Sequence, residues 1–310
     1  MKSELGERAT AAYLGLAVGD ALGATLEFMT PREIQLTYGT HRNIIGAGWL
    51  NLKPGQVTDD TAMSLALGEC ILKEKKIIPY AIADTFSHWL RKNPVDVGHT
   101  VRRGIIHFRY SGIPVVPEDE MNAGNGACMR TLPIALSTLF QEEIDIIMYS
   151  RDHTHTTHNN KLSDAATECL IFMIQGAMLG MKKADLKTKW ILPLIEKFPV
   201  FEFETKHREN PSGFIVETCQ AVFQAFFNNS NFEDSLIDVV NRGGDSDTTG
   251  AILGMLAGAH YGYSAIPQEW IRRLDPSIKH SCKQQSMDLI GLAFESSKRE
   301  IDCNHLVVNG

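Results

Sequence analysis

The chain has 310 residues, of which 44% are hydrophobic and 22% charged, and its formal net charge is −7. This composition is that of an ordinary globular protein, and the length allows one large domain or two smaller ones. The acidic balance argues against nucleic-acid binding as a main role, because neutralising phosphates requires a basic surface. The sequence contains no run of about 18 uncharged apolar residues, so no membrane span is predicted.

The N-terminus and the cysteines indicate a reducing compartment. Charged residues interrupt positions 1–10, where a signal peptide would have an apolar core. No Cys-x-x-Cys pair is present, and most cysteines lie in apolar stretches, so we interpret them as buried free thiols. The six are Cys70, Cys128, Cys169, Cys219, Cys282 and Cys303. We therefore expect a cytoplasmic protein.

Apolar residues recur at three- and four-residue spacing through nearly the whole chain, which is typical of helices. In chain order, the predicted helices are Glu7–Ala24, Thr61–Lys73, Pro79–Leu90, Val97–Tyr110, Ala127–Leu139, Glu142–Arg151, Leu162–Leu179, Gly213–Phe227, Phe232–Asn241, Thr248–Tyr261, Pro267–Arg273 and Lys279–Ser297. Strand patterns are scarce, and long loops are predicted at residues 30–57, 111–126 and 198–212. No linker or fixed-period repeat divides the chain. We expect an all-α fold with a single domain over residues 1–310.

Glycine recurs in the first and penultimate predicted helices. Gly19 and Gly23 lie in the first, and Gly250, Gly254 and Gly258 in the other. Glycine costs a helix about 1 kcal/mol relative to alanine, so its repetition indicates a close helix crossing. Asp20 and His260 interrupt the apolar character, which favours packing in a soluble protein over membrane dimerisation.

Two acidic clusters stand at predicted helix starts. They are Thr58-Asp59-Asp60-Thr61 and Gly243-Gly244-Asp245-Ser246-Asp247-Thr248-Thr249. Either cluster could be a helix cap, because Thr and Asp accept from free backbone N–H groups. A cap needs only one such residue, however, and together the clusters offer enough oxygen ligands for two hard cations such as Mn²⁺ or Mg²⁺.

Three further features could carry chemistry. The loop Asn122-Ala123-Gly124-Asn125-Gly126-Ala127 could turn backbone N–H groups towards a diphosphate, or it could be an ordinary turn. The segment 153–160 holds three histidines. His153 and His155 are interpreted as parts of a polar loop that caps the next helix, and His158 as a candidate substrate contact. Glu27 lies between apolar neighbours and is either a partly buried functional acid or an exposed one.

The order of these motifs resembles that of the ADP-ribosylglycohydrolases. The resemblance spans residues 5–262 and includes the run Gly15-Leu16-Ala17-Val18-Gly19-Asp20-Ala21-Leu22-Gly23 with the two acidic clusters and the glycine loop. Segments 53–60 and 94–98 are similar to the branch of the family that acts on dinitrogenase reductase. Ala62, His99 and Asn122 depart from the pattern expected for that branch, which leaves the protein substrate open.

The resemblance implies an orthogonal α-helical bundle with two Mn²⁺ or Mg²⁺ ions in a cleft. Positions that match its metal ligands are Thr58, Asp59, Asp60, Asp245, Asp247 and Thr248. Positions that match its ADP-ribose site are Glu27, Asp96, Asn125 and His158, with Gly124 and Gly126 beside Asn125. Among these, Asp96, His158 and Glu27 are the catalytic candidates, with Asp96 for acid–base work or for holding the opened ribose and His158 for positioning it.

The implied activity is removal of ADP-ribose from an arginine of dinitrogenase reductase. The implied regulation is association with a PII signalling protein and an ammonium channel, and thus peripheral recruitment to the membrane through partners. The alternatives are a broader ADP-ribosyl-arginine hydrolase that reverses, for instance, a toxin's modification, a non-catalytic ADP-ribose-binding relative and, on the acidic clusters alone, a metal-dependent phosphohydrolase.

Overall fold

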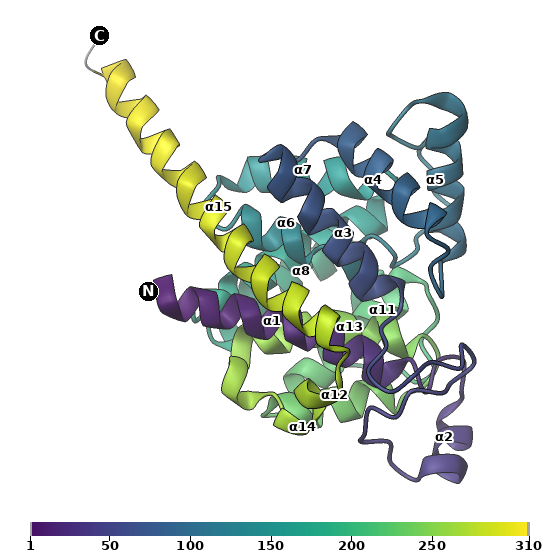
Figure 1. The fold of residues 1–310 in the computed structure, drawn as a ribbon. Coiled ribbons are helices and arrows are strands. Elements are labelled where there is room, and N and C mark those ends of the chain that lie inside the picture. The colour runs from purple at the N-terminus through teal and green to yellow at the C-terminus, as the bar shows by residue number, and fades with distance from the viewer. Residues whose placement is uncertain (1, 309–310) are drawn as a thin grey trace.

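The computed structural model describes residues 2–308, with side chains for residues 3–297, and its elements are helical (Figure 1). The α-helices are α1 (Lys2–Gly23), α2 (Pro31–Tyr38), α3 (Asp59–Glu74), α4 (Pro79–Arg91), α5 (His99–Ser111), α6 (Leu132–Ser137), α7 (Glu143–Thr154), α8 (Lys161–Met178), α9 (Lys183–Leu186), α10 (Leu192–Lys197), α11 (Ile215–Asn228), α12 (Phe232–Val240), α13 (Ser246–Tyr261), α14 (Gln268–Arg273) and α15 (Pro276–Val308). The described residues contain isolated bridges but no strand. The all-α single-domain prediction is confirmed.

Helices α1 and α13 form the centre of the fold and cross at backbone contact. A Cβ on Gly19 would lie 1.9 Å from the carbonyl oxygen of Gly250, and a Cβ on Gly23 would lie 2.1 Å from that of Ser246. Only glycine permits such an approach. The predicted close crossing is therefore confirmed, and it brings the C-terminal end of α1 against the N-terminal end of α13, where the second acidic cluster lies.

Apolar residues cover nearly all sides of both central helices. In α1, Leu14, Leu16 and Val18 are fully buried, and in α13 Leu253 and Leu256 are too. A helix that is apolar all round needs neighbours on every side. Helix α15 packs across α1 and then extends beyond the other helices, as the yellow end of Figure 1 shows.

Some sequence predictions of local structure were wrong. The loop predicted over residues 30–57 contains α2, which begins with a capping box between Thr30 and Glu33 and has Pro31 in its first turn. The loop predicted over residues 198–212 contains a short 3₁₀ turn, Pro199–Phe201, and residues 183–197 are helical although no helix was predicted there. The helix predicted over Ala127–Leu139 divides into a 3₁₀ turn at Cys128–Arg130 and α6.

The cysteines within the described side chains agree with the sequence interpretation. Cys70, Cys128, Cys169, Cys219 and Cys282 are free and buried, and burial raises the pKa of each of these thiols. The side chain of Cys303 lies outside the described residues. Of the helices in the described part of the chain, none has the length and apolar character needed to cross a bilayer.

Candidate active site

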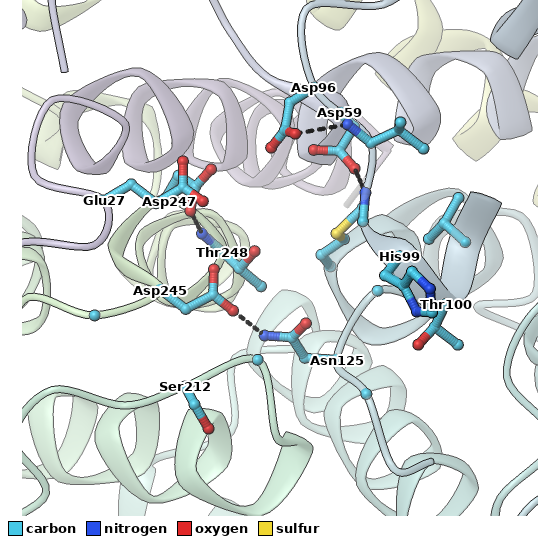
Figure 2. A pocket seen from close by; sticks show the side chains of 18 of the residues that line it. Glu27, Asp59, Asp96, His99, Thr100, Asn125, Ser212, Asp245, Asp247 and Thr248 are labelled. Atoms are coloured by element: carbon cyan, nitrogen blue, oxygen red, sulfur yellow. Dashed lines mark hydrogen bonds between the residues drawn. The ribbon is translucent and has the colours of Figure 1, made fainter. Parts of the chain in front are cut away.

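The predicted site residues meet in one cavity of about 590 Å³. Figure 2 shows acidic side chains from four segments around it, with Asn125 of the glycine loop beside Asp245. The predicted residues that line it are Glu27, Asp59, Asp96, Gly124, Asn125, Gly126, His158, Asp245, Asp247 and Thr248. His99, one of the departures from the family pattern, also lines it. Thr58 and Asp60 lie buried beneath.

The two acidic clusters are joined through Asp60. Its Oδ2 accepts hydrogen bonds from Thr58 Oγ1 at 3.2 Å and from Thr248 Oγ1 at 3.3 Å. Its other oxygen, Oδ1, is enclosed and has no hydrogen-bond partner among the described residues. Such an orphaned buried acceptor is costly, and a cation is the partner that would satisfy it.

The structure disfavours the helix-cap interpretation of both clusters. Thr58 and Asp245 occupy the N-cap positions of α3 and α13, yet neither side chain accepts a capping hydrogen bond. A residue from α1 caps α3 instead. Asp20, fully buried, accepts from the backbone N–H of Thr58 at 2.9 Å and from that of Thr61 at 3.1 Å. The carboxylates of the first cluster are therefore left free to face the cavity.

The sequence analysis placed Asp20 in the first family motif and noted that it interrupts an apolar helix, but assigned it no role in the site. It also accepts from Thr61 Oγ1 at 2.5 Å, and burial raises its pKa to about 6. A charged residue within a glycine-rich, otherwise apolar helix was the readable signal, since such a group is buried only with partners. Asp20 fixes the first cluster from a helix 38 positions earlier in the chain.

Glu27 belongs with the second cluster. One oxygen from each of Glu27, Asp245 and Asp247 lies within 4.8 Å of the others, an arrangement that could hold a metal ion. Trp49 Nε1 donates to Glu27 Oε2 at 2.5 Å, and nothing in the sequence pointed to this tryptophan, which lies in the predicted loop. Glu27 was assigned a catalytic role from the sequence, and its position also makes it a candidate metal ligand.

The acidic residues are buried together without a neutralising base. Burial first, and then neighbouring carboxylates, raise the pKa of Glu27 to about 8 and that of Asp59 to about 7. The same causes hold the pKa values of Asp60 and Asp247 well above the ordinary range. No described Lys or Arg forms an ion pair with any of them. An oxygen-only donor set with this charge fits hard divalent cations.

The glycine loop packs against both the acidic cluster and His158. Asn125 Nδ2 donates to Asp245 Oδ2 at 2.6 Å and to Thr218 Oγ1 at 2.9 Å. A Cβ on Gly124 would lie 3.0 Å from His158 Nε2, so a larger residue there would press on the imidazole. The backbone N–H of Asn125 already donates to Gly213 O. The Asn125 N–H is therefore not available to an anion, although the sequence predicted that the N–H groups of this loop could face a diphosphate.

The interpretation of His153 and His155 as a polar loop that caps the next helix was wrong, because His153 lies within α7 and Asn160 caps α8. His153 is fully buried, with its nitrogens 3.2 Å from the carbonyl oxygens of Ser150 and Ala127. His155 contacts Asp164 at 2.9 Å. Only His158 lines the cavity.

Asp96 lies at the cavity wall beside the first cluster (Figure 2). Its Oδ1 accepts from the backbone N–H of Val97 at 2.7 Å. Asp59 Oδ2 accepts from the next backbone N–H, that of Gly98, at 3.2 Å. The two carboxylates are thus held by successive peptide groups, and Asp96 is half-buried with access to the cavity.

Comparison with known proteins gives the family. Residues 1–299 match the ADP-ribosylglycohydrolase family. The ADP-ribosyl-[dinitrogen reductase] glycohydrolase of Rhodospirillum rubrum is 45% identical over 289 residues, covering 93% of this chain and 97% of that protein. The ADP-ribosylarginine hydrolase Tri1 of Pseudomonas putida is 32% identical over 86% of this chain and 74% of its own.

The fold is shared as well. A solved structure described as an ADP-ribosylglycohydrolase-related protein complex superposes with a TM-score of 0.84 at 32% identity, covering 94% of this chain and 99% of that one. The motif order, the helical fold and the match over nearly the whole sequence agree. This protein belongs to the ADP-ribosylglycohydrolase family.

Proposed function

We propose that this protein removes ADP-ribose from an ADP-ribosylated arginine of dinitrogenase reductase, with two divalent cations as cofactors. The main support for this proposal is that both acidic clusters, the glycine loop and His158 line one cavity or lie directly beneath it. The relative named for this substrate in Rhodospirillum rubrum matches this chain over nearly its full length, which supports the choice of protein substrate.

The proposed cation ligands are the two acidic clusters. They comprise Thr58, Asp59, Asp60, Asp245, Asp247 and Thr248, and we add Glu27 for its place in the acidic triad. Bound there, Mn²⁺ or Mg²⁺ would bind the vicinal ribose hydroxyls and polarise a water molecule. Thr58 and Thr248 donate their hydroxyl protons to Asp60, which leaves their oxygen lone pairs available as ligands.

The bond to be broken joins ribose C1 to a guanidinium nitrogen, and the leaving guanidine needs a proton. Asp96 is our candidate for acid–base work, because its carboxyl group faces the cavity and burial raises its pKa. Glycosidic cleavage commonly passes through an oxocarbenium-like state. The surrounding carboxylates would stabilise that positive charge electrostatically.

The direct test is release of ADP-ribose from an ADP-ribosyl-arginine peptide in the presence of Mn²⁺ or Mg²⁺. Asp60→Ala and Asp245→Ala are each expected to lose metal affinity and at least about 100-fold in rate while the protein stays folded. Asp288→Ala, which removes an exposed carboxylate of α15, is the matched control and should keep full activity. Absence of turnover at every metal concentration would overturn the proposal.

The protein substrate needs a separate comparison. We expect faster hydrolysis of modified dinitrogenase reductase than of other arginine-modified proteins. Equal rates would favour a broader arginine hydrolase, which is what the name of the Pseudomonas putida relative describes. Tight ADP-ribose binding without turnover in calorimetry would favour a non-catalytic binder. Regulation by a PII protein stays a prediction of the sequence resemblance.

A further inference from the structure

Arg130 is a buried cation directly behind the cavity wall. Its side chain is fully enclosed, and its guanidinium carbon lies 4.5 Å from the centroid of the Phe86 ring. Nη1 donates to the carbonyl oxygen of Gly126 at 3.0 Å, and Nη2 donates to Thr157 Oγ1 at 2.6 Å. Burial lowers the pKa of Arg130 to about 9, an effect that the charge of Asp59 partly opposes, but no described carboxylate lies within ion-pair distance of the guanidinium. A buried, unpaired charge is costly and calls for a specific purpose.

Thr157 connects this cation to His158. Its Oγ1 lies 2.7 Å from His158 Nδ1, and the residue itself is buried. The backbone of α5 holds Thr157 in place, because a Cβ on Gly104 would lie 2.7 Å from Thr157 Cα. Arg130, Thr157 and His158 therefore form a chain of hydrogen bonds that ends at the glycine loop.

Chemistry fixes the direction of the hydrogen bond from Arg130, and satisfying the buried hydroxyl proton of Thr157 sets that of the bond to His158. A guanidinium has donors and no acceptor, so Thr157 Oγ1 must accept from Arg130. The hydroxyl proton of Thr157 then needs an acceptor, and His158 Nδ1 is the partner within reach among the described residues. An imidazole nitrogen that accepts carries no proton. In neutral histidine the other nitrogen, Nε2, must then carry it.

We infer that Arg130 and Thr157 are positioning residues that hold His158 as the neutral tautomer protonated on Nε2. Nε2 is the nitrogen that faces the glycine loop, 3.0 Å from where a Cβ of Gly124 would stand. His158, which lines the cavity, thus carries its N–H on the nitrogen beside the glycine loop. The inference rests on the proposed function for its ligand, an oxygen of ADP-ribose, and it excludes His158 as the general base.

The electrostatic setting agrees with this geometry. Burial, and next the positive charge of Arg130, hold the pKa of His158 well below its ordinary value. A second proton on the ring would also have to displace the Thr157 hydrogen bond. These two effects keep His158 neutral, with one ring nitrogen available as a donor.

The primary test is the tautomer itself, read from ¹⁵N chemical shifts of the imidazole nitrogens in ligand-free protein. His158→Asn identifies the signals by their loss. We expect Nδ1 to be unprotonated and Nε2 protonated in the wild type. Thr157→Val removes the hydroxyl, and Arg130→Met frees Thr157 Oγ1 to accept instead, so each variant should populate the tautomer protonated on Nδ1. A wild type already protonated on Nδ1 overturns the inference.

Binding supplies the second readout. Thr157→Val should weaken ADP-ribose affinity about tenfold, the size expected for one charge-assisted hydrogen bond, and Thr157→Ser should restore it. Thr156→Val is the matched control, since Thr156 Oγ1 donates to His153 O and does not contact His158. It should change neither affinity nor tautomer. Equal effects of Thr156→Val and Thr157→Val would show that the chain of hydrogen bonds from Arg130 to His158 has no specific role and that both variants act through packing.

The two proposals can fail separately. The tautomer is measured without metal, substrate or turnover, so a protein that shows the assigned tautomer but releases no ADP-ribose contradicts only the proposed function. If Arg130→Met does not fold, as thermal unfolding will show, the Thr157 variants still decide the inference.

Discussion

Asn125 donates its side-chain N–H to Asp245 at 2.6 Å, and this bond joins the glycine loop to the acidic cluster at the start of α13. The two residues are 120 positions apart in the chain. A displacement of the loop would therefore move the Asp245 carboxylate, and a displacement of Asp245 would move the loop, because this hydrogen bond connects them. Asn125 therefore does more than line the cavity.

Asn125→Asp should lower ADP-ribosyl-arginine hydrolysis by at least about tenfold, because it replaces a donor with a carboxylate that repels Asp245 (a charged hydrogen bond is worth ~1.5–3 kcal/mol). Steady-state rates at saturating metal measure the effect. Asn229→Asp is the matched control, since Asn229 Nδ2 donates to Asp238 Oδ2 at 2.9 Å away from the cavity. It should affect stability alone, and an active Asn125→Asp enzyme would contradict the assignment.

Trp49→Phe should raise the Mn²⁺ concentration needed for half-maximal activity by about three- to tenfold, as loss of a hydrogen bond to a carboxylate predicts. The ring contact with Phe28, at 5.2 Å between centroids, is kept. Trp49 is 54% exposed, so stability should hardly change. Trp190→Phe is the control, because Trp190 stacks on Phe172 and its buried N–H has no partner among the described residues. Unchanged metal dependence in Trp49→Phe would refute the role of this bond.

Stability without metal should depend on pH in a defined direction. Burial raises the pKa of Glu27 from 4.5 to about 8 and that of Asp59 from 3.8 to about 7. Between these limits the folded protein binds more protons than the unfolded chain, so the unfolding free energy falls as pH rises. Buried histidines such as His153 and His260, whose pKa values are lowered to about 3 and about 4, act in the opposite direction at lower pH, so in a chelator the melting temperature should fall from about pH 6.5 to about pH 8.

Added Mn²⁺ should remove most of that fall, because a bound cation favours the ionised carboxylates. Asp59→Asn should flatten the profile in the chelator, since one of the raised groups is gone. A melting temperature that stays constant across this range in the chelator would show that the carboxylates are not buried together as described.

Gly19→Ala should destabilise the protein by about 3 kcal/mol or more, because its methyl group would meet the Gly250 carbonyl at 1.9 Å. Gly291→Ala is the matched control on α15, where nothing lies within 4 Å of the added Cβ. It should stabilise the helix by about 0.5–1 kcal/mol. Denaturant unfolding compares the two. Similar values for both variants would contradict the close crossing of α1 and α13.

The sequence predicted those parts of the fold that depend on local pattern. Long helices such as α8 and α13 repeat apolar residues over several turns, and the acidic clusters could be placed at helix starts. Helix α2 was missed because its eight residues are too few to show periodicity. Its start was nonetheless readable, since Thr30, Pro31 and Glu33 form a cap signature.

The partners within the site could not be predicted, because they depend on how distant helices pack. Asp20 reaches Thr58 only where α1 meets α3, and Glu27 joins Asp247 only where α1 ends against α13. The hydrogen bond from Thr157 to His158 is local in sequence, but its direction is set by Arg130, 27 positions away. A motif identifies which residues are candidates for the site. Their protonation states and the ligands they share depend on tertiary contacts, which the sequence alone does not show.

The crossing of α1 and α13 also bears on how the protein is made. Ser246 Oγ donates to Gly23 O across 223 positions of chain, so α1 meets α3 early in translation but is covered by α13 only after most of the chain has been made. Until then its apolar surface is available to chaperones, and only the first acidic cluster exists. The proposed cation site, which draws on both clusters, can therefore form only after residues 245–248 have been translated.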